Sequence, residues 1–188
     1  SGVHSNGYTL VRAIVERSGN SLAEKCPFDS NHDNRVIERF EEGDITLGEV
    51  LLNPTRIYVD PLIDLIKKCR EGMGPCDISD IKAMAHITGG GLSNLLRLHD
   101  DFGWHIDNPL PVLPEFTWLA EKGSVSNREM HRTFNMGMGM TIVISKEKSS
   151  YVEKWLNERL PGTRRVGYVH DKRREVTHAD SEIVFSHY

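Results

Sequence analysis

Apolar side chains recur at helical spacing in several separate stretches of the chain. In residues 8–18, Leu10, Val11, Ile14 and Val15 share one helical face, and Gly19 follows. This spacing predicts a helix that ends at the glycine. By the same reasoning, we expect a short helical turn over 47–52 and helices over 61–71, 92–98, 114–122, 126–132 and 149–160. The helix over 61–71 is expected to have Asp60 as its N-cap and Pro61 at its first position.

Strands are predicted by a different spacing, in which apolar and polar residues alternate. Residues 81–88 alternate in this way and are followed at once by Gly89, Gly90 and Gly91. Residues 140–145 and 165–170 read as strands on either side of the helix over 149–160, which predicts a β-α-β unit with a right-handed crossover. Val176 and residues 183–185 can add edge strands. The expected class is α+β, with helices packed on a mixed sheet.

Composition narrows the classes of protein that the chain can belong to. Its 188 residues are 38% apolar and 27% charged, without internal repeats, which favours one compact domain. With 23 basic and 27 acidic residues and a net charge of −4, we expect no nucleic acid and no anionic membrane as partner. Cys26, Cys69 and Cys76 form no CxxC pair, so we expect buried thiols and a cytoplasmic protein. Residues 20–45 read as a polar irregular stretch, with a solvated acidic run over 38–44.

The segment 85–92 (AHITGGGL) carries the strongest local signal. Three glycines between a strand and a helix let the backbone turn and aim its N–H groups, together with the helix dipole, at one anion. His86 and Thr88 share one strand face and can add a proton donor and a hydroxyl there. The alternative is a tight turn required only for packing. The segment matches neither a Walker loop nor GxGxxG.

A second candidate lies before the first helix, in residues 2–7 (GVHSNG). His4, Ser5 and Asn6 can bring an imidazole and an amide to a polar substrate. The alternative is that Ser5 or Asn6 simply caps the helix.

Two further segments are open to more than one interpretation. In residues 135–140 (NMGMGM), Gly137 and Gly139 allow a ligand to approach the backbone closely, or form a β-bulge or close strand packing. Arg56, in the segment 54–58 (PTRIY), is either an anion-binding fork or a surface arginine. The nine histidines lack metal-site spacing, so no metal ligand is expected, and the three tryptophans are expected in the core.

Taken together, the motifs occur in the order found in a known family. The chain resembles the C-terminal domain of phosphoribosylformylglycinamidine cyclo-ligase, also called aminoimidazole ribonucleotide synthetase. The matching segments are 1–12 (SGVHSNGYTLVR), 51–59 (LLNPTRIYV), 85–92 (AHITGGGL) and 133–140 (TFNMGMGM). The resemblance implies a three-layer α/β/α domain with ferredoxin-like β-α-β elements over residues 1–188.

The resemblance also implies a reaction and roles for individual residues. Family members use ATP to phosphorylate the formyl oxygen of formylglycinamidine ribonucleotide, and ring closure then releases ADP and phosphate to give aminoimidazole ribonucleotide. His4 is the implied catalytic residue, either for proton handling or for stabilising the phosphorylated amide, with Ser5 and Asn6 orienting the substrate. Gly89, Gly90 and Gly91 are implied to cradle the ribose phosphate, with His86 and Thr88 lining the same pocket and Asn135 and Gly137 in the wall of the cleft.

An N-terminal domain that holds Mg²⁺ and ATP and forms the homodimer is implied for the family and is expected to be absent from this chain. We therefore expect that the chain alone does not catalyse cyclisation. Two alternatives stay open. The first is another ATP-dependent member of the superfamily, such as formylglycinamidine synthetase, selenophosphate synthetase, thiamine-monophosphate kinase or a hydrogenase maturation factor. The second is a non-catalytic ligand-binding module.

Overall fold

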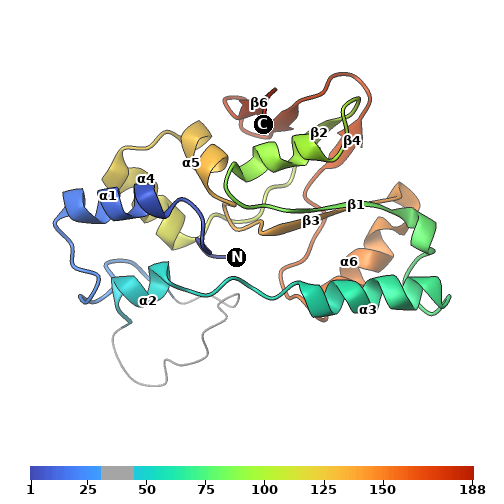
Figure 1. Ribbon diagram of the computed structural model, residues 1–188, viewed down its shortest axis with the longest axis horizontal. Helices are drawn as coiled ribbons and strands as arrows, with labels where there is room; N and C mark the ends of the chain where they lie inside the picture. Colours follow the sequence, from blue (N-terminus) through green and yellow to red (C-terminus); the bar gives the residue numbers. More distant parts are fainter. Residues whose placement is uncertain (31–44) are drawn as a thin grey trace.

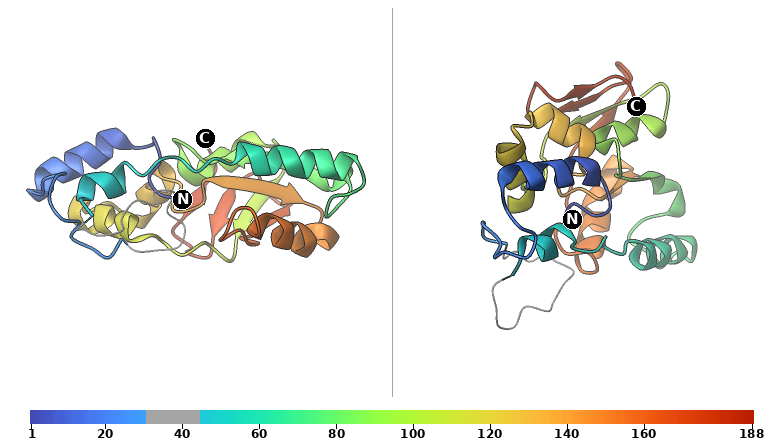
Figure 2. Two further views of the ribbon diagram at one scale, coloured as in Figure 1. Left: turned by 90° about the horizontal axis from the view of Figure 1, so that it is seen from below. Right: turned by 60° about the vertical axis from the view of Figure 1, so that its left-hand side comes forward.

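The computed structural model describes residues 1–30 and 45–188 (Figure 1). One end of the elongated molecule holds a group of helices: α1 (Tyr8–Ser18), α2 (Leu47–Leu51), α4 (Pro114–Gly123) and α5 (Asn127–Thr133). Figure 2 shows α1, α2 and α4 at this end and α3 and α6 at the other, with the amino terminus between them. The expected solvated acidic run over 38–44 lies outside the described residues.

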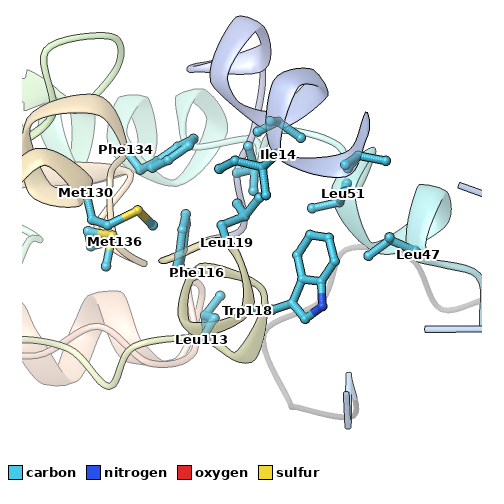
Figure 3. Close-up of a cluster of buried hydrophobic side chains, with 13 residues drawn as sticks. Ile14, Leu47, Leu51, Leu113, Phe116, Trp118, Leu119, Met130, Phe134 and Met136 are labelled. Carbon is cyan, nitrogen blue, oxygen red and sulfur yellow. The ribbon is translucent and has the colours of Figure 1, made fainter. Parts of the chain in front are cut away.

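The helical group is held together by a buried apolar cluster. Phe116 and Leu119 of α4 meet Ile14 of α1 and Phe134 just after α5, and all four side chains are at most 2% exposed (Figure 3). Val3 is fully buried in the same cluster. Because burying each large apolar side chain is worth about 1.5–3 kcal/mol, this cluster anchors the segment before α1 to the helical group.

The other end is built on a two-stranded ribbon. Strand β1 (Ile81–His86) pairs antiparallel with β3 (Met140–Ile144), with His86 opposite Met140. Helices α3 (Val59–Arg70) and α6 (Ser149–Asn157) pack on one face of this ribbon through a cluster that includes Leu65, Cys69 and Val152. These two helices lie along the same side of the ribbon in Figure 1.

A second, mixed sheet has the strand order β4–β2–β5–β6. Its strands are β2 (Gly103–Ile106), β4 (Tyr168–His170), β5 (Val176–His178) and β6 (Val184–Phe185). β2 runs parallel to β5 and antiparallel to β4. Three short 3₁₀ helices complete the described elements: η1 (Ile78–Asp80), η2 (Gly91–Arg97) and η3 (Lys146–Lys148).

The α+β class is confirmed, but the β-α-β unit expected over 140–170 is wrong for the described residues. β3 pairs with β1 in the ribbon, whereas β4 pairs with β2 in the other sheet. The strand expected over 165–170 is also shortened to Tyr168–His170. The three-layer arrangement stays a prediction.

Three helices differ from those expected, in their start, their end or their type. The helix expected over 149–160 is α6, which ends at Asn157. α3 begins at Val59 with Tyr58 as its N-cap, so Asp60 lies in the first turn instead of capping the helix. Pro61 fits there because the first turn has no intrahelical acceptor for its missing N–H, and a carboxylate in that turn is favoured by the helix dipole. The helix expected over 92–98 is the seven-residue 3₁₀ helix η2 and not an α-helix.

Candidate functional site

His4 occupies an unusual backbone conformation just before α1. Its φ is 59°, in the left-handed region, and its side chain is 3% exposed. Among the described residues, neither of its ring nitrogens has a hydrogen-bond partner. Buried polar atoms are normally paired, so an imidazole left unpartnered here points to a role outside the packing of this chain.

Neither Ser5 nor Asn6 caps helix α1. The N-cap is Gly7, with φ 67° and no side-chain cap. A Cβ at Gly7 would come within 2.5 Å of the Phe134 ring, so glycine is required by packing as well as by its φ. The capping interpretation of this segment is therefore wrong. Ser5 is exposed, and Asn6 is half-buried and free to serve another purpose.

Asn6 binds to the glycine loop formed by residues 89–91. The backbone N–H of Gly89 donates to Oδ1 of Asn6 over 3.0 Å, a contact between residues 83 positions apart. Two of the motifs singled out in the sequence therefore meet directly. The Nδ2 group of Asn6 carries two further donors.

The three glycines of this loop have different structural roles. A Cβ at Gly91 (φ 51°) would lie 2.0 Å from the carbonyl oxygen of His131, so the packing interpretation holds at this position. At Gly90 (φ 100°), a Cβ would lie 2.9 Å from Nδ2 of Asn94. Gly89 has only Oδ1 of Asn6 nearby, at 4.0 Å, and is exposed. The approach to Gly89 is thus the part of the loop open to a ligand.

Asn94, which was not singled out from the sequence, holds the glycine loop in its conformation through hydrogen bonds. Its Nδ2 donates to the carbonyl oxygens of Gly89 (3.2 Å) and Gly91 (2.8 Å), and its Oδ1 accepts from Thr88 Oγ1 (3.2 Å). Ser93 adds bonds to Gly90 O from its N–H (3.1 Å) and its hydroxyl (2.7 Å). These bonds span three to six residues and tighten the turn, and the i to i+3 bonds among them are those of a 3₁₀ helix, which replaces the expected α-helix. A helix this short adds little dipole, so anion binding here would depend on the loop itself.

The segment after α5 returns to the start of the chain. The Nδ2 group of Asn135 donates to Gly2 O (2.8 Å), and its Oδ1 accepts from the Gly137 N–H (2.7 Å). Asn135 is 1% exposed, so it ties these two backbone segments together. Gly137 (φ 93°) also accepts a bond from the amino group of Ser1 over 2.9 Å.

Tyr58 lies between two of the histidines singled out in the sequence. Its ring centroid is 6.4 Å from that of His4 and 5.9 Å from that of His86, the latter edge-on at 67°. Its hydroxyl makes a close hydrogen bond with the Ser1 hydroxyl. A Cβ at Gly139 would come within 2.1 Å of the Tyr58 hydroxyl and 2.8 Å of His4 Cε1. Four parts of the chain therefore meet here: residues 1–4, Tyr58, His86 and Gly139. Gly139 allows the close packing because it has no side chain.

Burial sets the protonation of this cluster. Desolvation, followed by the positive charges of the amino terminus and His86, lowers the pKa of His4 from 6.5 to about 4. Burial raises the pKa of Tyr58 above its usual 10, opposed by the Ser1 hydrogen bond and by Arg56. At pH 7, His4 is thus a neutral base and Tyr58 a neutral phenol.

A cavity of about 850 Å³ adjoins the cluster. Ser1, Tyr58, Gly137 and Gly139 line it on the cluster side, whereas His4 and the loop 89–91 do not. Its volume lies within the range of about 300–1,000 Å³ that is typical of small-molecule sites. Arg56 lines the same cavity and donates from Nη1 to Pro161 O over 2.9 Å.

Histidines also pair away from this cluster. His131 of α5 and His178 of β5 have ring centroids 5.0 Å apart, and Nδ1 of His131 donates to Asn127 O over 2.9 Å. Burial lowers the pKa of both imidazoles. This pair fastens α5 to β5, on the side of the loop where Gly91 packs against His131.

The remaining candidates have structural places. Trp104 and Trp118 are buried, as expected, and Trp155 is partly buried with the Arg159 guanidinium 3.6 Å from its ring centroid. The buried thiols of Cys69 and Cys76, seven residues apart, lie 3.6 Å from each other. Within 1–30 and 45–188, no group of three or more His, Cys, Asp or Glu residues has a geometry that could hold a metal ion. In the same ranges, no helix is both long and apolar enough to cross a membrane.

Together, these observations describe an α+β domain in which the segment before α1 carries the buried imidazole of His4 and contacts the glycine loop through Asn6. The chain belongs to the family described as AIR synthase related protein, C-terminal domain, which matches residues 1–180. The resemblance to the cyclo-ligase family that the motifs indicated is thereby confirmed.

Several curated relatives carry the same kind of sequence. The chain is 40% identical over 180 residues to a phosphoribosylformylglycinamidine cyclo-ligase of Crocosphaera subtropica, covering 94% of this chain and 46% of the relative. It is 38% identical over 150 residues to the enzyme of that name from Methanosarcina acetivorans, covering 80% and 38%. A Drosophila melanogaster trifunctional purine biosynthetic protein adenosine-3 is 42% identical over 159 residues, covering 83% and 10%. The chain thus spans less than half the length of these relatives.

Proposed function

We propose that this chain forms the substrate-side domain of an ATP-dependent cyclo-ligase that converts formylglycinamidine ribonucleotide to aminoimidazole ribonucleotide in purine biosynthesis. Support comes from the family membership and from the names of the relatives. The single observation that carries the chemistry is His4, a buried and unpartnered imidazole linked through its own loop to Gly89.

The proposed reaction needs a base at the step that closes the ring. The formyl oxygen is a poor leaving group until ATP phosphorylates it, after which the ribosyl-bearing amidine nitrogen attacks the same carbon. Phosphate then leaves with that oxygen, and the attacking nitrogen loses a proton. The His4 imidazole is neutral at pH 7, so a ring nitrogen is available to accept this proton. Because its pKa of about 4 lies well below pH 7, His4 then passes the proton on to the departing phosphate or to water. In this proposal, Asn6 orients the substrate and the open approach at Gly89 receives its ribose phosphate.

Mg²⁺ and ATP are proposed to be held by another part of the enzyme. The described residues contain no cluster of acidic side chains fit to hold a metal ion, so we derive no step of the reaction through it. A homodimer and a cytoplasmic location are likewise proposed by analogy with the family.

The proposal is tested by measuring turnover of formylglycinamidine ribonucleotide. We expect no cyclisation by the 188-residue chain alone, and ATP-dependent cyclisation when it is joined to the amino-terminal part of the Crocosphaera cyclo-ligase. In that joined protein, His4→Asn keeps a residue that tolerates positive φ and is expected to lower kcat about 100-fold, as the loss of a general base does. Tyr151→Phe, at a site that is 62% exposed and does not line the cavity, serves as the control.

Two results would contradict the proposal. Turnover by the chain alone would show that no other domain is required, and an unchanged kcat for His4→Asn would remove the proposed role of His4. Preference of the joined protein for a different phosphoryl acceptor would instead favour another member of the superfamily.

A further inference from the structure

Tyr58 makes more contacts within the candidate site than any role proposed above requires. Its ring meets two histidines from different parts of the chain, His4 and His86, at centroid distances of 6.4 and 5.9 Å. Its hydroxyl bonds to Ser1, and it marks the start of α3 as the N-cap residue. It is therefore fixed from three sides: by α3 through its backbone, by Ser1 at its hydroxyl, and by the two imidazoles along its ring.

Tyr58 lines the neighbouring cavity and also contacts His4. Tyr58, Ser1 and Gly139 line the 850 Å³ cavity, but His4 does not. At Gly139 the hydroxyl groups of Tyr58 and Ser1 and the Cε1 atom of His4 come together, within 2.1, 3.0 and 2.8 Å of where a Cβ would be. The two hydroxyl-bearing side chains thus lie at the boundary between the imidazole and the open space.

We propose that Tyr58 is the positioning residue of this site: its ring fixes the orientation of the His4 and His86 imidazoles and closes His4 off from the cavity, and the bond to Ser1 helps to hold that ring in place. The Tyr58 ring meets His86 edge-on at 67° and His4 at a tilt of 59°. Aromatic rings prefer edge-on or offset arrangements, so these contacts favour one orientation of each imidazole, and His4 has no hydrogen bond among the described residues to set its own. Tyr58 thereby excludes water from His4, and this desolvation is the main cause of the lowered pKa of His4.

The proposal gives Tyr58 no chemical step. Burial raises its pKa, so it remains a neutral phenol and acts only through the imidazoles. This role rests on the proposed function insofar as His4 is the base, but the arrangement of the three rings can be tested without turnover.

The experiment compares Tyr58→Phe with Tyr58→Leu in the 188-residue chain, with His4 titrated by NMR of ¹³C-labelled histidine. Phenylalanine keeps the ring, so we expect the pKa of His4 to stay near 4. Leucine is shorter and has no ring, so water from the cavity reaches His4, and we expect its pKa to rise to about 5 or higher. Cooperative thermal unfolding establishes that each variant is folded.

A matched control exists in the same chain. Tyr168 lines the same cavity and also lies between two histidines, with centroids 5.2 Å from His105 and 6.3 Å from His170, but it is 51% exposed and does not contact His4. Tyr168→Leu is expected to leave the titration of His4 unchanged.

The proposal is overturned if folded Tyr58→Leu still titrates His4 near 4. If that variant does not fold, Tyr58→Met, which retains more apolar volume, makes the same prediction. Failure of both to fold while Tyr58→Phe folds would reduce Tyr58 to a packing residue and would also overturn the proposal.

A second readout separates this proposal from the proposed function. In the joined cyclo-ligase, Tyr58→Leu is expected to lower kcat about 10-fold with little change in KM, and Tyr58→Phe to restore most of kcat. If the joined protein shows no turnover at all while the titrations behave as expected, the reaction is wrong and the positioning role stands. If turnover is normal and Leu does not change the titration, the positioning role is wrong and the reaction stands.

Discussion

The chain contains two tyrosines that each lie between two histidines, and the two clusters differ in burial. Tyr58 contacts His4 and His86, and His4 is 3% exposed without a hydrogen-bond partner among the described residues. Tyr168 contacts His105 and is 51% exposed, and Nδ1 of His105 lies 2.8 Å from Thr177 Oγ1. Of the four imidazoles, only that of His4 is buried; His86 is exposed, and His105 and His170 are partly exposed. The clusters contain the same residue types, so what distinguishes the Tyr58 cluster is the desolvation of one imidazole that has no partner among the described residues.

The largest expected difference between the clusters is a pH dependence of stability. The folded pKa of His4 is about 4 against 6.5 for an unperturbed histidine, so the folded state binds fewer protons between these values. The contribution of His4 to the free energy of unfolding is therefore constant above about pH 7 and falls as the pH drops from 6.5 to 4, by up to about 3 kcal/mol. His131 and His178, whose pKa values are also lowered, act in the same direction.

Urea unfolding at a series of pH values measures this effect. His4→Asn is expected to flatten the curve by the His4 share, whereas Tyr168→Phe, in the exposed cluster, should run parallel to the wild type. If His4→Asn kept the wild-type slope, the acid sensitivity would have to originate in the His131–His178 pair.

The next largest expected effect is a loss of stability when Gly139, which packs against Tyr58 and His4, is replaced. In Gly139→Ala, the new methyl group would come within 2.1 Å of the Tyr58 hydroxyl and 2.8 Å of His4. We expect a loss of about 2 kcal/mol in urea unfolding, because overfilling a packed interior forces side chains to move. Gly89→Ala, which meets only Asn6 at 4.0 Å, should change stability by less than about 0.5 kcal/mol. Equal losses in the two variants would refute the close packing at Gly139.

The smallest effect tests the link from the buried cluster to the glycine loop. Asn6→Ala removes the acceptor of the Gly89 N–H and should cost about 1 kcal/mol, the usual net value of one hydrogen bond. Amide hydrogen exchange at Gly89 is expected to quicken, while Ser5→Ala, at an exposed neighbour, should leave it unchanged. An unaltered Gly89 rate in Asn6→Ala would mean that the two loops are held together by something else.

Local patterns predicted the helices and the ribbon strands well because both depend on neighbours in sequence. The face formed by Leu10, Val11, Ile14 and Val15 corresponds to α1, and the alternation in 81–88 corresponds to β1. Strand β2 was not predicted: it has four residues, Gly103–Ile106, and its partner strands β4 and β5 lie more than 60 positions further on. The same non-local pairing places β4 in a different sheet from β3.

The candidate site was predicted as a set of segments, but not as an arrangement. The motifs containing His4, Gly89 and Asn135 were all recognised, yet the contacts between them depend on distant parts of the fold. Tyr58 was missed although it lies inside the matching segment 51–59, because only the structure brings it against His4 and His86. The packing need at Gly91 was likewise hidden, since it arises from the carbonyl oxygen of His131 forty residues away.

The bond from Asn135 to Gly2 O joins residues 133 positions apart. Closing so long a loop is entropically costly and favours late formation of the contact during folding. During synthesis, the segment that contains His4 emerges from the ribosome long before Asn135 and Gly139 exist to hold it. The candidate site is thus expected to be the last part of this domain to take shape, after the helical group and the ribbon have formed around it.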